Sequence, residues 1–420
     1  MAGSITAMAV SKMRAFPARL FSAHNDVLPA KLQHFRSENS EKRFTQDGSA
    51  ALEQELKTLC DRVLDGVQSA LPARKLQALV LGGGYGRGQG GVLRTDDADQ
   101  PYNDLEFYVF LRGLGVWNER KFSRALNRLG EQLSRDADLH VEFKIDSLAR
   151  LRRSPVTMFS YDLVCGHRIL FAPDGDFAGC EAHQDAARIP LSEATRLLFN
   201  RGTGLLLAQE KLQRENLSAD ECDFIGRNLA KAQLALGDIV LTDAGQYHWN
   251  CLERHERLKR FSDFEKMPWL SEVKRHHAEG VDFKLHPRRI YKSHRQFITE
   301  HAEISNIARQ LWLWIESRRL GERFSTARDY GLSAQRKCDR GWAIRNVLLN
   351  ARTFGARAIF DPLALRYPRE RLLNSLPLLL WETPLNDLRV KRHLRKQLRT
   401  AASDWQGFVT AYKSFWPAFS

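Results

Sequence analysis

KLQALVLGGGYGRGQGG, residues 75–91, joins a short apolar run to a segment in which seven of ten residues are glycine. The run from Leu76 to Leu81 has the length of a strand and ends abruptly at the first glycine. Glycine amides can approach phosphate oxygens closely, and Arg87 inside the segment could pair with a phosphate. We therefore predict a strand that leads into a phosphate-binding loop.

Two other kinds of glycine motif do not fit this segment. It lacks the Gly-Lys-Ser/Thr ending of a P-loop. Gly86, Gly88 and Gly91 have the spacing of a dinucleotide-binding loop, but an aspartate-rich loop and a strand follow where that motif requires a helix. A flexible glycine-rich turn is the plain alternative, and the density of glycine favours a functional role.

The next predicted strand carries two acids. In NDLEFYVFL, residues 103–111, alternate residues point to opposite faces, which places Asp104 and Glu106 on the same face. Neighbouring carboxylates repel each other unless cations lie between them, and hard oxygen ligands suit Mg²⁺ or Mn²⁺. Such metal pairs serve phosphoryl transfer. An isolated pair of acids is usually an ordinary solvent-facing edge, but the adjoining glycine segment favours a metal site.

A third acid lies on a third predicted strand, LHVEFKID, residues 139–146, which follows a helix with Asn118 as its predicted N-cap. Glu142 falls on the polar face of this strand, where it could orient or deprotonate an acceptor hydroxyl or bind a metal. Asp146 shares that face but stands at the strand end, so we favour Glu142. A salt bridge between Glu142 and Lys144 is the structural alternative.

The order of these elements predicts the fold class. Strand, glycine segment, strand, helix and strand follow one another, and a short strand at residues 168–171 closes an α/β (α+β) unit with a mixed sheet. From residue 190 onward the pattern is helical, and Ser218 with Glu221 has the spacing of a capping box. We predict an N-terminal extension that is poorly ordered (residues 1–48), the α/β domain (49–182) and a helical domain with a basic tail (188–420).

These features together resemble the DNA polymerase β-like nucleotidyltransferase superfamily, especially its minimal bacterial members. The family pattern is a hydrophobic strand, Gly-Gly or Gly-Ser, often continued by Ala-Arg-Gly, then an acid pair on a strand and a third acid on a later strand. The matching residues are Gly83 and Gly84, then Gly86, Arg87 and Gly88, then Asp104 and Glu106, and finally Glu142.

The resemblance covers about residues 50–175 and implies a role for each matching residue. The implied nucleotide-binding residues are Gly83, Gly84 and Arg87, and the implied catalytic residues are Asp104, Glu106 and Glu142, of which the first two hold the metal. The chain departs from the family pattern in having Gly84 where serine is usual, Glu106 where aspartate is commoner, and a longer spacing before Asp104. These departures leave open a degenerate domain that binds nucleotide without strong activity.

The helical half resembles the family domain that builds the other wall of the nucleotide cleft. In RNLAKAQLALGDIVL, residues 227–241, Lys231 matches the family lysine that contacts the triphosphate, and it lies off the apolar line of the helix together with Arg227. A triphosphate beside metal ions needs such positive charge. A solvated helix face is the equal alternative for any single lysine. NRGTGLL, residues 200–206, places Arg201 and two glycines inside a predicted helix, a pattern that we attribute to helix packing.

Composition limits the partners and the class of protein. The chain of 420 residues has a formal net charge of +14, which favours anionic partners such as nucleotides or RNA. Basic clusters at residues 274–277, 286–295 and 389–399 could follow an RNA backbone, although aromatic residues for base stacking are few. Six scattered cysteines without a CxxC pair argue against a zinc ribbon or a disulfide framework. The longest apolar run, residues 372–381, is too short to span a membrane.

The first 24 residues contain no acid and are rich in alanine, serine and basic residues, a composition that resembles an organellar transit peptide. We prefer a disordered N-terminus and expect a cytoplasmic protein. The expected activity is metal-dependent transfer of a nucleoside monophosphate from a nucleoside triphosphate, with ATP as donor, to a small molecule, a protein side chain or an RNA end. The alternatives are a non-catalytic nucleotide- or RNA-binding module and an enzyme of RNA-terminal nucleotide addition.

Overall fold

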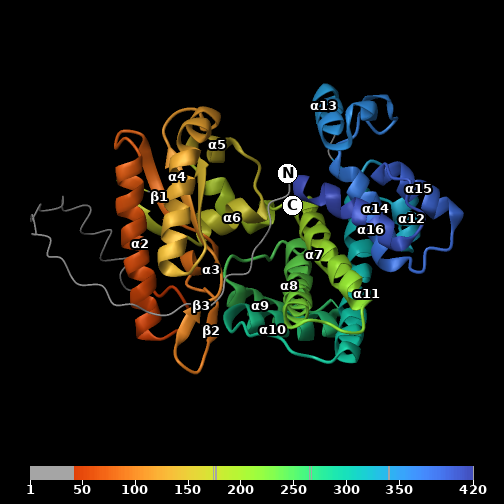
Figure 1. Ribbon diagram of the computed structural model, residues 1–420, viewed down its shortest axis with the longest axis horizontal. Coiled ribbons are helices and arrows are strands. Elements are labelled where there is room, and N and C mark those ends of the chain that lie inside the picture. Colours follow the sequence, from red (N-terminus) through yellow and green to blue (C-terminus); the bar gives the residue numbers. More distant parts are fainter. Residues whose placement is uncertain are drawn as a thin grey trace, which may run out of the picture. The chain divides into compact units, whose positions relative to one another are not determined.

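The computed structural model describes residues 42–173, 175, 177–263, 265, 267–338 and 341–419 (Figure 1). Residues 1–41, which include the segment that resembles a transit peptide and most of the predicted extension, lie outside the described residues. The end of that extension belongs to the fold. Phe44 is buried, its carbonyl accepts a hydrogen bond from the Gly90 amide at 3.0 Å, and Thr45 forms an isolated bridge with Gly90.

A four-stranded mixed sheet organises the N-terminal half, as the order of elements predicts. Its strands are β1 (Leu76–Leu81), β4 (Leu105–Leu111), β5 (Val141–Asp146) and β6 (Arg168–Phe171). They lie in the order β5-β4-β1-β6, with β1 antiparallel to both of its neighbours and β4 parallel to β5. Between β1 and β4 the chain forms a separate hairpin of β2 (Val92–Arg94) and β3 (Asp99–Pro101).

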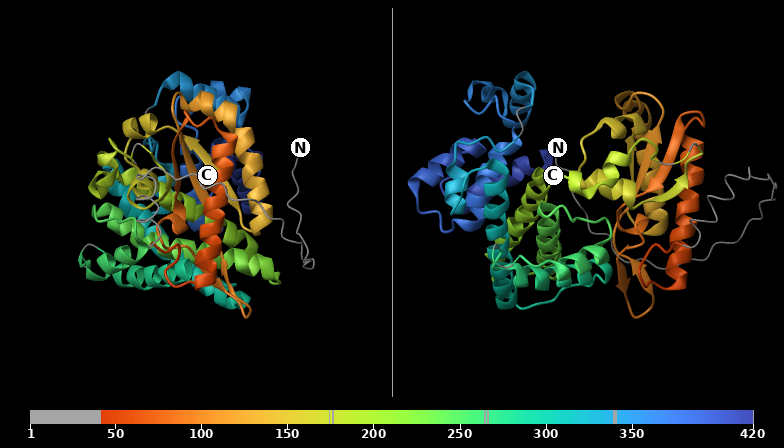
Figure 2. Two further views of the ribbon diagram at one scale, coloured as in Figure 1. Left: turned by 90° about the vertical axis from the view of Figure 1, so that its left-hand side faces the viewer. Right: turned by 180° about the vertical axis from the view of Figure 1, so that it is seen from behind.

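Both faces of the sheet are buried, and the alternation predicted for β4 is confirmed. The covering helices are α2 (Ala50–Ala70), α4 (Gly115–Ala137), α5 (Leu148–Arg153) and α6 (Met158–Cys165). Leu105 and Phe107 pack in one core with residues of α2 and α4, which lie side by side on one face (Figure 2). Tyr108 and Phe110 pack in a second core with residues of α5 and α6. Because a slip of one residue would exchange the two faces, this burial determines where Glu106 points.

One local prediction about this half is wrong. Helix α4 begins at Gly115, with Leu114 as its N-cap, and not at Asn118. Asn118 is buried inside the helix, and its side-chain amide donates a hydrogen bond to the Arg112 carbonyl at 3.3 Å. The polar side chain that looks like a cap in the sequence therefore ties the helix back to the end of β4.

The rest of the described chain is helical, as predicted. Its helices are α7 (Leu191–Leu212), α8 (Ala219–Asp243), α9 (Cys251–Arg260), α10 (Leu270–Leu285), α11 (His294–Leu320), α12 (Ala327–Leu332), α13 (Ala343–Phe354), α14 (Arg369–Trp381), α15 (Leu388–Leu398) and α16 (Trp405–Phe415). Short 3-10 turns are η1 (Glu181–Gln184), η2 (Ala186–Arg188), η3 (Ala356–Phe360) and η4 (Trp416–Ala418). The capping box of Ser218 and Glu221 opens α8, as predicted. None of the described helices has both the length and the apolar character that crossing a membrane requires.

The glycines of α7 allow close helix packing, which confirms our interpretation of them. A β-carbon at Gly204 would lie 2.5 Å from Asn228 Oδ1 of α8, and one at Gly202 would lie 3.1 Å from a leucine of α14. The same packing brings Arg201 of α7 close enough to Lys231 of α8 to lower the pKa of that lysine.

Candidate functional site

The glycine segment forms a tight single-turn helix, α3 (Gly83–Gly86), directly after β1. Gly83 has a φ of +62°, a conformation that favours glycine. A β-carbon at Gly86 would lie only 2.1 Å from the Leu81 carbonyl oxygen. No side chain caps the turn, so its first amides have no capping acceptor. Part of the glycine content is therefore required by the turn itself, and part leaves backbone amides accessible.

Glu106 lies against this turn. The Gly82 amide donates a hydrogen bond to the Glu106 carbonyl at 2.9 Å. A β-carbon at Gly83 would lie 3.2 Å from Glu106 Oε2, so that glycine leaves space beside the carboxylate which a larger residue would fill. The structure thus brings together the predicted residues Gly83 and Glu106.

The three predicted acids lie near the start of the paired strands β4 and β5. Asp104 directly precedes β4 and is exposed, and among the described residues it forms no ion pair or hydrogen bond. Glu106 and Glu142 are direct partners in the parallel register of β4 and β5. Asp146 lies at the other end of this pairing, opposite Phe110. The register therefore places Glu142, and not Asp146, beside the acid pair.

Lys144 joins two of these acids. Its Nζ donates a hydrogen bond to Glu106 Oε1 at 2.7 Å and lies 3.2 Å from Glu142 Oε2. Desolvation alone would lower the pKa of Lys144, but the hydrogen bond and the charge of Glu106, together with Tyr108 and Glu142, raise it overall. The salt bridge that was the structural alternative for Glu142 is therefore present, and it includes Glu106.

Asp104 and Glu106 offer carboxylate oxygens, the type of ligand that a hard divalent ion prefers. No group of three or more His, Cys, Asp or Glu side chains suited to a metal occurs within the described part of the chain. Mg²⁺, however, is commonly held by one or two carboxylates and completes its shell with water and substrate phosphates. The Asp104 carboxylate has no partner among the residues that the structure describes, whereas Lys144 occupies the side of Glu106 that faces Glu142. These contacts favour a site centred on Asp104.

Arg87 has a partner of its own. Its Nη1 lies 2.9 Å from Asp162 Oδ2 on α6, and its side chain is largely buried. Burial raises the pKa of Asp162, while Arg87 opposes this change. The Tyr247 hydroxyl donates a second hydrogen bond to Asp162 Oδ2 at 3.3 Å. The structure therefore places Arg87 in a buried polar network instead of leaving it unpaired beside the acids.

One cation of the helical half, Lys231, lies within electrostatic reach of Asp104. The pKa of Lys231 is lowered by desolvation and by the charges of Arg201 and Arg227, and Asp104 acts in the opposite direction. Neither Lys231 nor Arg201 has an ion-pair partner within the described ranges, whereas Arg227 lies 3.0 Å from Asp223. The sequence predicted Lys231 as a nucleotide-binding residue. It did not predict a role for Arg201, because the neighbouring glycines indicate helix packing and do not show which way the arginine side chain points.

A buried ion-pair network lies behind this site and joins the sheet half to the helical half. Arg254 Nε of α9 lies 2.6 Å from Asp238 Oδ1 of α8, and His277 Nε2 of α10 lies 3.2 Å from the same oxygen. Arg254 also donates a hydrogen bond to the His248 carbonyl at 2.7 Å. Gln89, at the end of the glycine segment, accepts a hydrogen bond from the Cys251 amide at 3.0 Å. The position of the glycine segment thus depends on the helical half.

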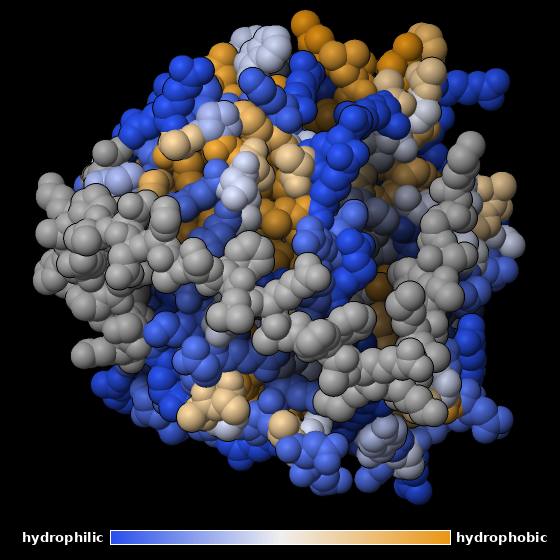
Figure 3. Space-filling model, turned by 60° about the vertical axis from the view of Figure 1, so that its left-hand side comes forward, coloured by the Kyte–Doolittle hydropathy of each residue, from blue (hydrophilic) through white to orange (hydrophobic). Residues whose placement is uncertain are grey.

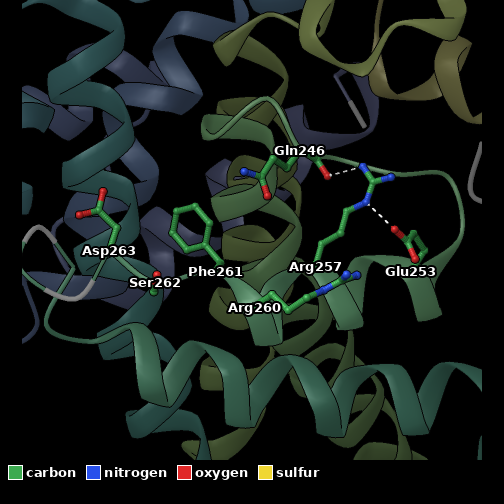
Figure 4. Close-up of a pocket in the computed structure, with 7 residues that line it drawn as sticks. All are labelled: Gln246, Glu253, Arg257, Arg260, Phe261, Ser262 and Asp263. Carbon is green, nitrogen blue, oxygen red and sulfur yellow. Dashed lines mark hydrogen bonds and ion pairs between the residues drawn. The ribbon is translucent and has the colours of Figure 1, made fainter.

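A cavity formed by α9 and its flanking segments does not belong to the candidate site. Its volume is about 850 Å³, and it is lined by Gln246, Glu253, Arg257, Arg260, Phe261, Ser262 and Asp263 (Figure 4). The Arg257 guanidinium within it is already engaged by Glu253 Oε1 at 2.8 Å and by the Gln246 carbonyl at 3.1 Å.

No protein-family model, no curated protein and no solved structure matches this chain.

Proposed function

We propose that this chain is a metal-dependent nucleotidyltransferase, which moves a nucleoside monophosphate from a nucleoside triphosphate, with ATP as the expected donor, to an acceptor. The observation that supports this proposal best is the opposition of charges. The carboxylate of Asp104 lies within electrostatic reach of Lys231, and both are free of ion pairs among the described residues. A triphosphate with its metal ion needs carboxylates on one side and cations on the other.

Each residue of the site then has a distinct role. Asp104 and Glu106 would hold Mg²⁺ or Mn²⁺, which when bound neutralises phosphate charge and activates the attacking oxygen. Glu142 would orient the acceptor or accept its proton. Lys231 and Arg201 would neutralise the triphosphate oxygens from the helical side.

The amides of Gly83 and Gly84 would contact the phosphates from the sheet side, where Gly83 leaves space beside Glu106. We do not assign Arg87 to the nucleotide, because its ion pair with Asp162 holds it in the buried network. Loss of that ion pair would affect nucleotide binding only indirectly, by changing the position of the glycine turn α3.

The direct test is transfer of label. Purified protein is incubated with each α-³²P-labelled nucleoside triphosphate and Mg²⁺ or Mn²⁺, with and without cellular RNA and lysate. We expect label to appear on RNA, on protein or on a small molecule, and the labelled product identifies the acceptor class. Binding of nucleotide without transfer under any of these conditions would reject the enzyme in favour of a non-catalytic module.

A more specific form of the proposal is that the acceptor is the end of an RNA. The basic cluster at residues 286–295 contains the exposed Tyr291, but several of its charges are already paired. Arg288 lies 2.9 Å from Asp282, and Lys292 is paired with Glu300 at 2.6 Å. This pairing weakens the attraction for a phosphate backbone, so a small molecule or a protein fits the site equally well.

Lys144 supports the non-catalytic alternative, because its ammonium group already neutralises two of the three acids. Substitution of Lys144 tests whether this ammonium group competes with a metal ion. We expect Lys144→Met to raise the affinity for Mn²⁺ in the absence of nucleotide, since the competing ammonium is gone. The Lys144 side chain is 37% exposed and partly screened by solvent, so the expected gain is about tenfold, or ~1.4 kcal/mol. Titration calorimetry and the electron paramagnetic resonance of free Mn²⁺ measure it.

Two variants serve as controls for this test. Lys144→Arg keeps the charge and should bind Mn²⁺ as the wild type does. Lys121→Met removes an exposed lysine of α4, away from the acids, and should also have no effect. Equal Mn²⁺ affinity in all four proteins would show that Lys144 does not compete with a cation.

A further inference from the structure

Helix α13 has its polar and apolar faces reversed relative to an ordinary surface helix. Its buried residues are Asn346, Asn350 and Phe354. The Asn350 side-chain amide donates hydrogen bonds to the carbonyls of Ala364 and Arg366 at 3.1 and 2.8 Å. Asparagine thus holds the following loop on the inner face, where Phe354 is also buried, whereas Ile344 and Leu348 lie on the outer face.

The outer face exposes large hydrophobic side chains. Trp342, which precedes the helix, is 82% exposed, Ile344 is 76% exposed and Leu348 is 65% exposed. Phe360 of the adjoining turn η3 is 84% exposed. We define the α13 surface as Trp342, Ile344, Leu348, Ile359, Phe360 and Leu365, which make up six of the thirteen large exposed hydrophobic residues among those described. A second group of exposed hydrophobic residues, Leu114, Val116 and Trp117, lies at the start of α4, and Figure 3 shows that hydrophobic residues also reach the surface in the upper part of another face.

Three arginines lie on or beside the α13 surface. Arg345, Arg352 and Arg357 are exposed, and none has an ion-pair partner within the described ranges. Asp361 lies in the same segment, and it is already held by Arg371 at 2.9 Å and by Arg399 at 3.6 Å. The surface therefore combines free-standing aromatic and aliphatic side chains with unneutralised guanidinium groups.

We propose that the α13 surface binds the surface of an anionic lipid membrane. Tryptophan, phenylalanine and aliphatic side chains enter the boundary between head groups and acyl chains, while arginine pairs with anionic head groups. A second copy of the chain would bring the same free arginines against one another. RNA would stack on Trp342 and Phe360 but would leave the four aliphatic residues in contact with phosphate and sugar. None of these residues belongs to the candidate site, so the proposal is independent of the nucleotidyltransferase activity.

The test is sedimentation of the full chain with large unilamellar vesicles of phosphatidylcholine, prepared with and without phosphatidylglycerol. We expect binding only to the vesicles that contain phosphatidylglycerol, with affinity that falls as salt is added. The double variant Trp342→Ala/Phe360→Ala should lower the partition coefficient about tenfold, since both side chains insert when bound. The double variant Arg345→Glu/Arg352→Glu should lower it by a similar factor.

Trp117→Ala is the matched control, because Trp117 is also an exposed tryptophan (67%) but lies on α4. It should bind vesicles as the wild type does, and circular dichroism should be unchanged in every variant, since all the altered side chains are exposed. Failure of the wild-type protein to sediment with vesicles that contain phosphatidylglycerol would overturn the proposal. So would vesicle binding that survives both double variants, or self-association in solution that the Trp342→Ala/Phe360→Ala variant abolishes.

Discussion

On the proposed function, replacement of Asp104 by alanine should lower the rate of nucleotidyl transfer about a thousandfold, because loss of a metal ligand would cost several kcal/mol in the transition state and each 1.4 kcal/mol is tenfold in rate. The same substitution leaves the free energy of unfolding within about 0.5 kcal/mol of the wild-type value. Asp104 is exposed and has no ion pair or hydrogen bond in the described part of the chain, so its removal breaks no stabilising contact. Transfer of ³²P label and urea denaturation measure the two quantities.

Two further variants separate metal binding from general charge. Asp97→Ala removes an exposed acid of the loop between β2 and β3 and should leave the rate unchanged. Asp104→Asn keeps the size of the side chain but loses the charge, and it should be nearly as inactive as the alanine variant. Full activity in Asp104→Ala would reject the assignment of the site, whereas equal losses in Asp97→Ala and Asp104→Ala would indicate a purely electrostatic effect of net charge.

The strands of the sheet could be predicted because burial leaves a pattern with a period of two. Leu105 and Phe107 pack in one core, and Tyr108 and Phe110 pack in the other. A shift of β4 by one residue would therefore exchange the side chains of the two cores. The register with β5 then follows from the geometry of a parallel pair, and it places Glu142 opposite Glu106. Local pattern therefore accounts for the placement of the acids.

Partners that are distant in sequence could not be predicted in this way. Arg87 and Asp162 are separated by 75 positions, and nothing local to either residue signals their pairing. Arg201 is followed in its helix by two glycines, which indicate close packing but do not show which way the Arg201 side chain points. The α13 surface could not be predicted from the sequence pattern for a further reason, since two of the three buried positions of α13 are asparagines while Ile344 and Leu348 face outward. Each of these features depends on tertiary contacts that no single segment encodes.

Replacement of Arg254 by methionine should be the most destabilising of the substitutions considered. Arg254 and Asp238 are both buried with their charges 2.6 Å apart, and removal of one partner leaves the other uncompensated. Loss of one member of a buried pair costs about 3–5 kcal/mol of the free energy of unfolding. Arg260→Met, at an exposed position of the same helix, should cost less than about 0.5 kcal/mol. Urea denaturation at neutral pH measures both values.

The pH dependence of that loss identifies its cause. Burial acts to raise the pKa of Asp238, but Arg254 and His277 hold it below its ordinary value. The ionised pair therefore stabilises the wild type above the ordinary aspartate pKa of 3.8, and this stabilisation is lost as the pH falls through the lower folded value. In Arg254→Met the deficit should be greatest at neutral pH and shrink as the pH falls, first because Asp238 without its arginine takes up a proton above the ordinary pKa of 3.8, and then because the wild type loses its ionised pair below that value. A deficit that is constant between neutral and acid pH would show that the methionine variant loses packing and not charge compensation.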